Sequence, residues 1–146
     1  MTPSAALSAI LTQLRTVSGM SEARSPLGVR NASSGRVVRA FSVRPGGLSL
    51  SDGGGRGRSD QAGIRVAERF SVELGHTLRP SDGQTAPSQA LLDLHSVIKV
   101  LMKPGTTLTT EAAVVLGGVT SEYPGSGAYF VQTISVDVVY PLSLAV

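Results

Sequence analysis

Cysteine and tryptophan are absent from this 146-residue chain, and histidine and aromatic residues are scarce. Without cysteine the protein forms no disulfide and offers no thiolate to a metal. The two histidines, His76 and His95, lie far apart in the sequence with no second ligand at helical spacing, so we expect neither a metal site nor a cofactor. No apolar run reaches the roughly 18 residues of a membrane span. A basic region followed by an apolar core, as in a secretory signal, is also missing. We therefore expect no membrane partner and assembly in the cytosol.

Positive charge is concentrated in the first half of the sequence. Residues 1–75 contain ten Arg and five acidic residues, a net of +5, whereas residues 76–146 contain three basic and five acidic residues, a net of −2. The two halves together give the formal net charge of +3. Arginine suits phosphate or carboxylate recognition, but a GC-rich genome gives the same bias. The excess of arginine therefore does not identify a ligand by itself.

Hydrophobic periodicity predicts two helices and four strands. Apolar residues recur at spacings of three and four in residues 4–17 and 88–102, which is typical of amphipathic helices. Alternating apolar residues predict strands at residues 37–44, 64–74, 113–123 and 128–140. The last two are expected to form a β-hairpin, with a bulge at the consecutive glycines of the first of them. We therefore expect a single α+β domain over residues 1–146. Its architecture is a two-layer sandwich, in which two helices pack on one face of an antiparallel sheet of about four strands.

A Gly/Arg-rich segment, residues 45–63, reads PGGLSLSDGGGRGRSDQAG and cannot form a core of its own. Three interpretations stay open: a flexible hairpin tip, a loop that becomes ordered against a neighbouring subunit, and an arm that contacts nucleic acid. A phosphate-binding loop is the least favoured interpretation, because no Gly-Lys-Ser/Thr follows and a strand comes next.

Side chains suited to catalysis do not cluster in the sequence. No serine lies in a nucleophile-elbow motif, and there is no cysteine. Glu68 interrupts the apolar face of the second strand, but a lone inward-facing acid is expected to pair with an arginine or to lie near an edge. We expect the protein not to be an enzyme.

The second half of the chain resembles the tail terminator, or tail completion, proteins of long-tailed bacteriophages and gene transfer agents. The resemblance covers roughly residues 63–142. It rests on a strand RVAERFSVELG, a helix ALLDLHSVIKVLM and a closing hairpin GGVTSEYPGSGAYFVQTISVDVVYPL, in that order. It implies a structural virion protein, with no catalytic residues, that forms a hexameric ring. The ring would cap the tail tube, stop its polymerisation and join the tail to the head.

The same resemblance implies binding partners and a location in the virion. The tail tube protein would bind one face of the ring and the head-tail connector protein the other, in the tail or neck of a virion assembled in the host cytoplasm. Two alternatives stay open: another neck component, such as a head-closure or head-to-tail adaptor protein, and a small basic nucleic-acid-binding protein.

A ring requires two different patches on each subunit that meet each other. The expected interface residues lie in the Gly/Arg-rich segment, the closing hairpin and the apolar C-terminal residues: Leu48, Leu50, Tyr123, Tyr129, Val131, Leu142 and Leu144. A separate hypothesis places three arginines near the genomic DNA that passes through the lumen: Arg44, Arg56 and Arg58.

Overall fold

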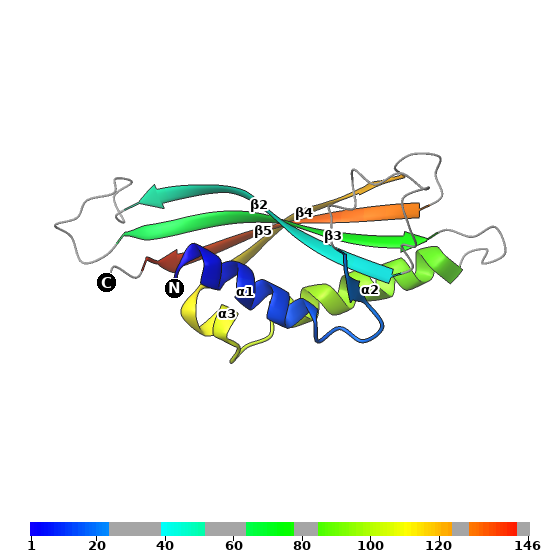
Figure 1. The fold of residues 1–146 in the computed structure, drawn as a ribbon, viewed down its shortest axis with the longest axis horizontal. Helices are drawn as coiled ribbons and strands as arrows, with labels where there is room; N and C mark the ends of the chain where they lie inside the picture. The colour runs from blue at the N-terminus through cyan, green and yellow to red at the C-terminus, as the bar shows by residue number, and fades with distance from the viewer. Residues whose placement is uncertain (24–38, 52–63, 78–84, 124–128, 143–146) are drawn as a thin grey trace.

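The computed structural model describes residues 1–23, 39–51, 64–77, 85–123 and 129–142. These residues form three helices and five strands, and their order along the chain is visible in Figure 1. The elements are α1 (Pro3–Leu14), β1 (Ser21–Glu22), β2 (Arg39–Ser51), β3 (Arg65–Thr77), α2 (Thr85–Leu101), α3 (Thr107–Glu111), β4 (Ala113–Glu122) and β5 (Tyr129–Pro141).

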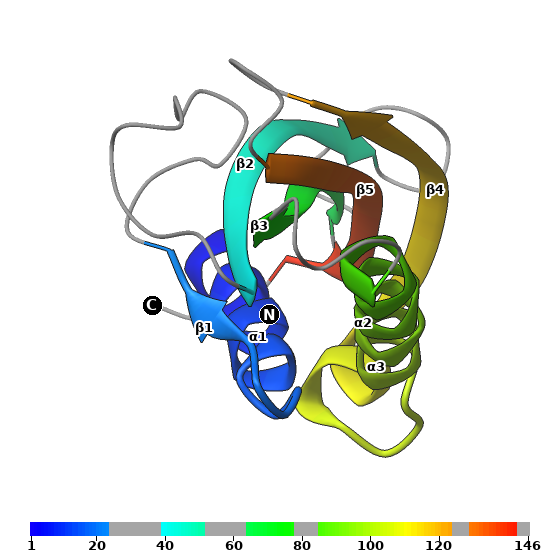
Figure 2. The same cartoon turned by 90° about the vertical axis from the view of Figure 1, so that its right-hand side faces the viewer.

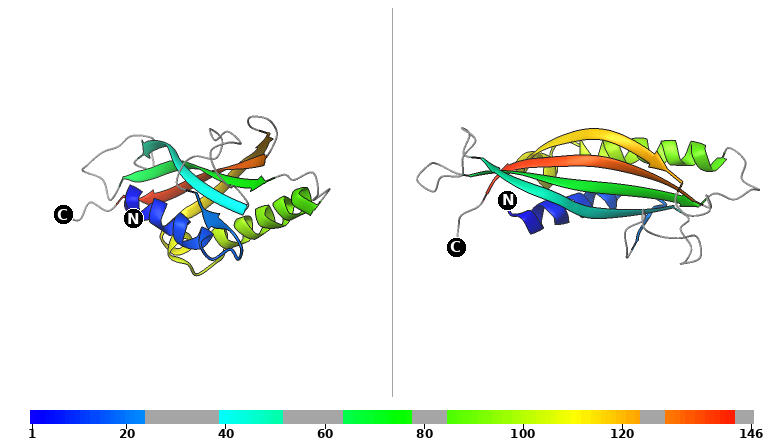
Figure 3. Two further views of the ribbon diagram at one scale, coloured as in Figure 1. Left: turned by 45° about the vertical axis from the view of Figure 1, so that its right-hand side comes forward. Right: turned by 90° about the horizontal axis from the view of Figure 1, so that it is seen from above.

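All five strands belong to one open sheet with the order β1-β2-β3-β5-β4. The two-residue strand β1 is parallel to β2, and the other three pairings are antiparallel. Four long strands therefore lie side by side, as the view from above shows (Figure 3). The strand β4 forms one edge of the sheet, and β2 with its short neighbour β1 forms the other.

The helices all lie on one side of the sheet, which curves over them (Figure 2). The first helix begins where the Thr2 hydroxyl accepts a hydrogen bond from the Ala5 amide at 3.2 Å and Pro3 occupies the first turn. Its buried residues recur at spacings of three, one and four and meet the sheet: Ala6, Ala9, Ile10 and Leu14. The amphipathic pattern thus fixes which side of α1 faces the core.

One continuous core lies between the helices and the sheet. Alternate residues of β3 and β5 point into it, and α2 contributes Val97 and Leu101. The strand residues in this core are Val66, Phe70, Val72, Leu74, Ile134, Val136, Val138 and Tyr140. Glu68 also points inward, and its carboxylate accepts a hydrogen bond from the Tyr140 hydroxyl at 3.0 Å. The sequence predicted an arginine partner for Glu68 or a position near an edge, but the residue lies on the inner strand β3 and a tyrosine of the neighbouring strand β5 supplies the donor.

The α+β class and the helices on one face agree with the expectation from the sequence, but the details differ. The sheet has five strands instead of about four, and there is a third helix. The additional elements are short: α3 begins with a reciprocal cap between Thr106 and Thr109, and β1 lies in a stretch without periodicity. Elements of two and five residues produce too little pattern to be detected.

The largest difference concerns β2. We expected a strand at 37–44 followed by a loop at 45–63, whereas β2 continues through Pro45, Gly46 and Gly47 to Ser51. The strand accommodates these residues by a shift of register between Pro45 and Gly47, and Gly47 adopts φ +152. An edge strand tolerates proline and a bulge better than a central strand does. Residues 52–63 lie outside the described residues.

The predicted hairpin of β4 and β5 is confirmed by their antiparallel pairing. The predicted bulge is confirmed as well, since the register shifts between Leu116 and Val119. A Cβ at Gly117 would lie 3.1 Å from the Cβ of Ser135, so the strands approach closely at this point.

Candidate assembly surface

The outer edge of β4 is open in the part of the chain that the structure describes. This strand pairs with β5 on one side and ends the sheet on the other. Its side chains are largely exposed: Val115 is 53% exposed, and Val119 is also a large exposed hydrophobic residue. Such an edge presents unpaired amide and carbonyl groups that can pair with another chain.

The opposite edge is open over most of its length among the described residues. The short β1 pairs with Ala40 and Phe41 of β2, and no described strand pairs with the outer side of residues 43–51. Two apolar side chains, Leu48 and Leu50, are about half exposed on this part of β2. Among the described residues the sheet therefore has two different open edges, each with exposed apolar side chains.

The face of the sheet away from the helices is mostly polar. Residues that pair across the strands lie on the same face, and they form successive rows. One row contains Ser42, Glu73 and Thr133, and the next contains Arg44, Ser71 and Ser135. We call this surface, which lies away from the helices, the open face, although Ser42 and Glu73 are buried on it.

Two ion pairs cross the open face between neighbouring strands. Arg44 Nη2 lies 2.6 Å from Glu73 Oε1, and Arg69 Nε lies 2.9 Å from Asp137 Oδ1. The hydrogen bond from Arg69 lowers the pKa of Asp137 below its usual value, against a smaller opposing effect of burial. Both arginines thus have a carboxylate that compensates their charge.

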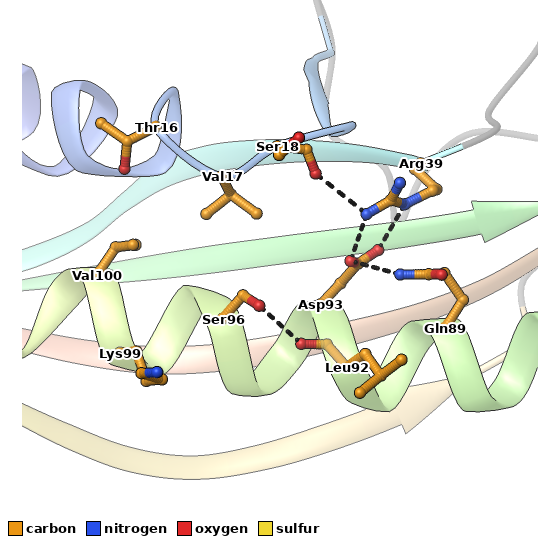
Figure 4. Close-up of a pocket in the computed structure, with 10 residues that line it drawn as sticks. All are labelled: Thr16, Val17, Ser18, Arg39, Gln89, Leu92, Asp93, Ser96, Lys99 and Val100. Atoms are coloured by element: carbon orange, nitrogen blue, oxygen red, sulfur yellow. Dashed lines mark hydrogen bonds and ion pairs between the residues drawn. The ribbon is translucent and has the colours of Figure 1, made fainter.

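A polar cluster connects α2 to the sheet at the end where β2 begins (Figure 4). Its centre is Asp93, whose side chain is only 3% exposed. Arg39 Nε donates to Asp93 Oδ2 at 2.9 Å and Arg39 Nη2 donates to Oδ1 at 2.6 Å. Gln89 donates to Oδ1 at 2.9 Å, and His76 Nε2 lies 2.6 Å from Oδ2. We call these four residues the α2 clamp.

The charge of Asp93 is stabilised by its partners. Burial alone would raise the pKa of Asp93, but the hydrogen bonds from Arg39, His76 and Gln89 together outweigh it and lower the pKa. Both carboxylate oxygens are occupied by donors, so Asp93 is poorly placed to accept a proton from a substrate. The α2 clamp is therefore an arrangement suited to holding α2 on the sheet.

A shallow groove of about 360 Å³ runs beside the α2 clamp between α2 and the end of α1. Its lining is mixed, with Leu92, Val100 and Val17 beside Lys99 and Ser96. No group of three or more metal-binding side chains occurs in the described ranges. Within the same ranges, no helix has the length and hydropathy needed to cross a membrane.

The residues expected from the sequence to form the subunit interface are not brought together as one patch. Leu48 and Leu50 are exposed on β2, whereas Tyr123 is 63% exposed after β4 and its ring centroid lies 5.1 Å from that of Phe130. Val131 is fully buried and packs with Ala40, so its side chain is not at the surface of the chain. Three further interface residues lie as follows: Leu142 is partly buried against the core, Tyr129 begins β5, and Leu144 is outside the described residues.

One of the three arginines of the DNA hypothesis lies within the described residues. Arg44 is half exposed on the open face and paired with Glu73. Arg56 and Arg58 lie outside the described residues.

The sequence reasoning missed the α2 clamp. A signal was present, because Asp93 lies between Ala90 and Val97 on the apolar side of the second helix, where a charge needs a partner. The partners were not detectable, since Arg39 and His76 come from two strands that are distant in sequence.

The elements define a two-layer α+β protein with one open sheet. No family model and no curated protein matches the sequence. A chain from the solved structure "Virion of native gene transfer agent (GTA) particle" has a similar structure, with a TM-score of 0.62 and 11% sequence identity over 92% of each chain. At this identity the similarity concerns the fold, which is shared over almost the full length of both chains.

Proposed function

We propose that this chain is a structural virion protein, and that it acts as a tail terminator. Its subunits form a hexameric ring that caps the tail tube, stops its polymerisation and joins the tail to the head connector. The observation that carries this proposal is the full-length similarity to a chain of a gene transfer agent particle. That protein is part of a virion, and the shared fold makes an assembly role the best supported function for this chain.

The surface of the chain agrees with an assembly role. It has two dissimilar open edges with exposed apolar residues, and a ring needs two different patches that meet each other. In its prominent polar cluster, the α2 clamp, the carboxylate of Asp93 is occupied by donors from the chain itself. Arg44 and Arg69 have carboxylate partners, which favours the structural role over non-specific nucleic-acid binding, where unpaired cations supply the affinity.

A head-closure or head-to-tail adaptor protein is the alternative within the same class, since such proteins also assemble into rings. The two functions differ in symmetry and in the proteins that they contact. A terminator binds the tail tube protein, whereas an adaptor binds the portal side of the neck.

The ring is tested by native mass measurement and imaging of the purified protein, alone and with the tail tube protein. We expect a six-subunit particle, and Leu50→Asp should shift it to smaller species because a charge would enter the interface. Ser49→Asp is the matched control, since it introduces the same charge on the same strand on the other face. A twelve-subunit ring, or a monomer under every condition including added tube protein, would contradict the terminator function.

A further inference from the structure

The two open edges of the sheet have properties that fit each other. The β4 edge carries no proline and no basic residue, and the chain has no basic residue at all after Lys103. The open part of the β2 edge, residues 43–51, has one arginine, Arg44, and no acidic residue. We propose that β4 of one copy pairs with residues 43–51 of β2 in the next copy, so that the sheet continues from subunit to subunit. This inference rests on the ring proposed above and specifies its interface.

The directions of the strands allow this pairing. The four long strands alternate in direction across the sheet, so β2 and β4 run in opposite directions. A neighbour related by rotation about an axis along the strands presents its β2 in the same direction as the first copy. Its β2 is then antiparallel to β4, and an antiparallel ladder can form. The free lengths also agree, with ten residues in β4 and nine in residues 43–51 of β2.

In one register the faces of the two strands agree at both ends of the paired segment. When Leu116 faces Leu50, six residues further on Glu122 faces Arg44. Each strand contains one register shift within this span, between Leu116 and Val119 in β4 and between Pro45 and Gly47 in β2. A single extra residue moves the following side chains to the other face. Each strand changes face once between these two pairs of residues. Leu116 and Leu50 therefore lie on one face of the sheet, and Glu122 and Arg44 lie on the other.

The faces can be assigned from the pairing within the chain. Leu116 pairs with Val136, and Leu50 pairs with Val66, and both of these partners belong to the core. The two leucines therefore lie on the helix side of the sheet, where their contact would extend the apolar layer.

At the other end of the span, both charged residues lie on the open face. Glu122 pairs with Val131, which clusters with Ala40 on the open face of the sheet. Arg44 lies on the same face, four residues after Ala40. The carboxylate of Glu122 would thus approach an arginine that already holds Glu73 and is about half exposed.

Charge favours this pairing over a two-fold pairing of β4 with itself. Two copies of β4 would bring together strands whose nearest charged residues, Glu111 and Glu122, are acidic. Like charges on facing strands are destabilising. The pairing of β4 with β2 instead brings Glu122, the charged residue of β4, near Arg44, the charged residue in the open part of β2.

The lack of cysteine makes a disulfide test specific, because every thiol is an introduced one. Leu50→Cys and Leu116→Cys are prepared separately, mixed and oxidised. Directly opposed residues in an antiparallel pair have Cβ atoms about 4.5–5.5 Å apart, close to the distance that a disulfide needs. We expect a cross-linked dimer only in the mixture, and a ladder up to the full ring when one chain carries both substitutions.

Val115→Cys mixed with Leu50→Cys is the matched control. Val115 is the neighbour of Leu116 and is well exposed, but it points to the open face. It should therefore form little disulfide with Leu50→Cys. Thermal melting of the reduced variants, followed by circular dichroism, checks that each one is folded.

Four results would contradict the proposed pairing. Equal cross-linking by Val115→Cys would mean that the register is wrong. Cross-linking of Leu116→Cys with itself would indicate a two-fold pairing of β4. A six-subunit ring without any disulfide between Leu50→Cys and Leu116→Cys would contradict the proposed strand pairing but not the proposed ring. Absence of any oligomer would contradict both proposals.

Discussion

Replacing Asp93 with alanine should destabilise the fold by about 3 kcal/mol. The substitution removes the carboxylate at the centre of the α2 clamp, and with it the hydrogen bonds from Arg39, His76 and Gln89. Loss of one partner of a buried ion pair costs about 3–5 kcal/mol. The side chain of Arg39 is 29% exposed and can be hydrated in the variant, so we expect the lower end of this range.

Thermal and urea unfolding followed by circular dichroism measure this change. An unfolding entropy of about 2.1 cal/mol/K per residue gives roughly 0.3 kcal/mol/K for this chain. A loss of about 3 kcal/mol then lowers Tm by about 10 °C. The matched control is Asp137→Ala, which removes the ion pair with the well-exposed Arg69. Exposed pairs contribute about 0.2–1 kcal/mol, so the control should change Tm by only about 1–3 °C.

The effect of Asp93 should depend on pH, because its pKa is lower in the folded protein than in the unfolded chain. A lowered pKa in the folded state means that the charge stabilises the fold above the unfolded pKa of about 3.9. This contribution is lost as the pH falls through the folded pKa. Asp93→Asn resembles the protonated acid, so the difference in stability between it and the parent protein should narrow below about pH 4. A loss below about 1 kcal/mol for Asp93→Ala at pH 7, or a difference for Asp93→Asn that does not change with pH, would refute the reasoning.

Two further substitutions test the contacts around the core. Tyr140→Phe removes the donor to the buried carboxylate of Glu68, and we expect a loss of about 1–3 kcal/mol in urea unfolding; an unchanged midpoint would contradict this. Gly19→Ala should cost about 1–3 kcal/mol, because Gly19 has φ +81 and its Cβ would collide with the Arg39 guanidinium. This cost should fall in the Asp93→Ala background, where Arg39 can move, and strictly additive losses would contradict the shared contact.

The general arrangement of the fold could be predicted because its elements are long and regular. The alternation in residues 128–140 corresponds to β5, and the apolar stripe in residues 88–102 corresponds to α2. Periodicity over this many residues indicates whether an element is a helix or a strand and which of its sides is buried. The length of β2 could not be predicted, because Pro45 and the two following glycines are typical of a turn. The pairing of β2 with β3 over its whole length outweighs that local preference.

The candidate site was less predictable than the fold. Exposure of Leu48 and Leu50 was expected, although for the wrong reason, since they belong to a strand and not to a loop. Val131 is buried in a small cluster with Ala40, and the two residues flank Gly75 from different strands. Sequence spacing gives the face of a strand, but it does not tell which part of that face is covered.

The α2 clamp and the proposed interface are connected through β2. Arg39 is the first residue of this strand and is held by Asp93, while Leu48 and Leu50 near its other end are exposed. A strand that pairs with a second copy in one register must first have one register in its own sheet. Pairing with β3 along the whole strand and the anchored Arg39 both provide this. In the proposed interface the clamp would act without touching a partner, because it would fix the register of the edge strand with which the partner pairs.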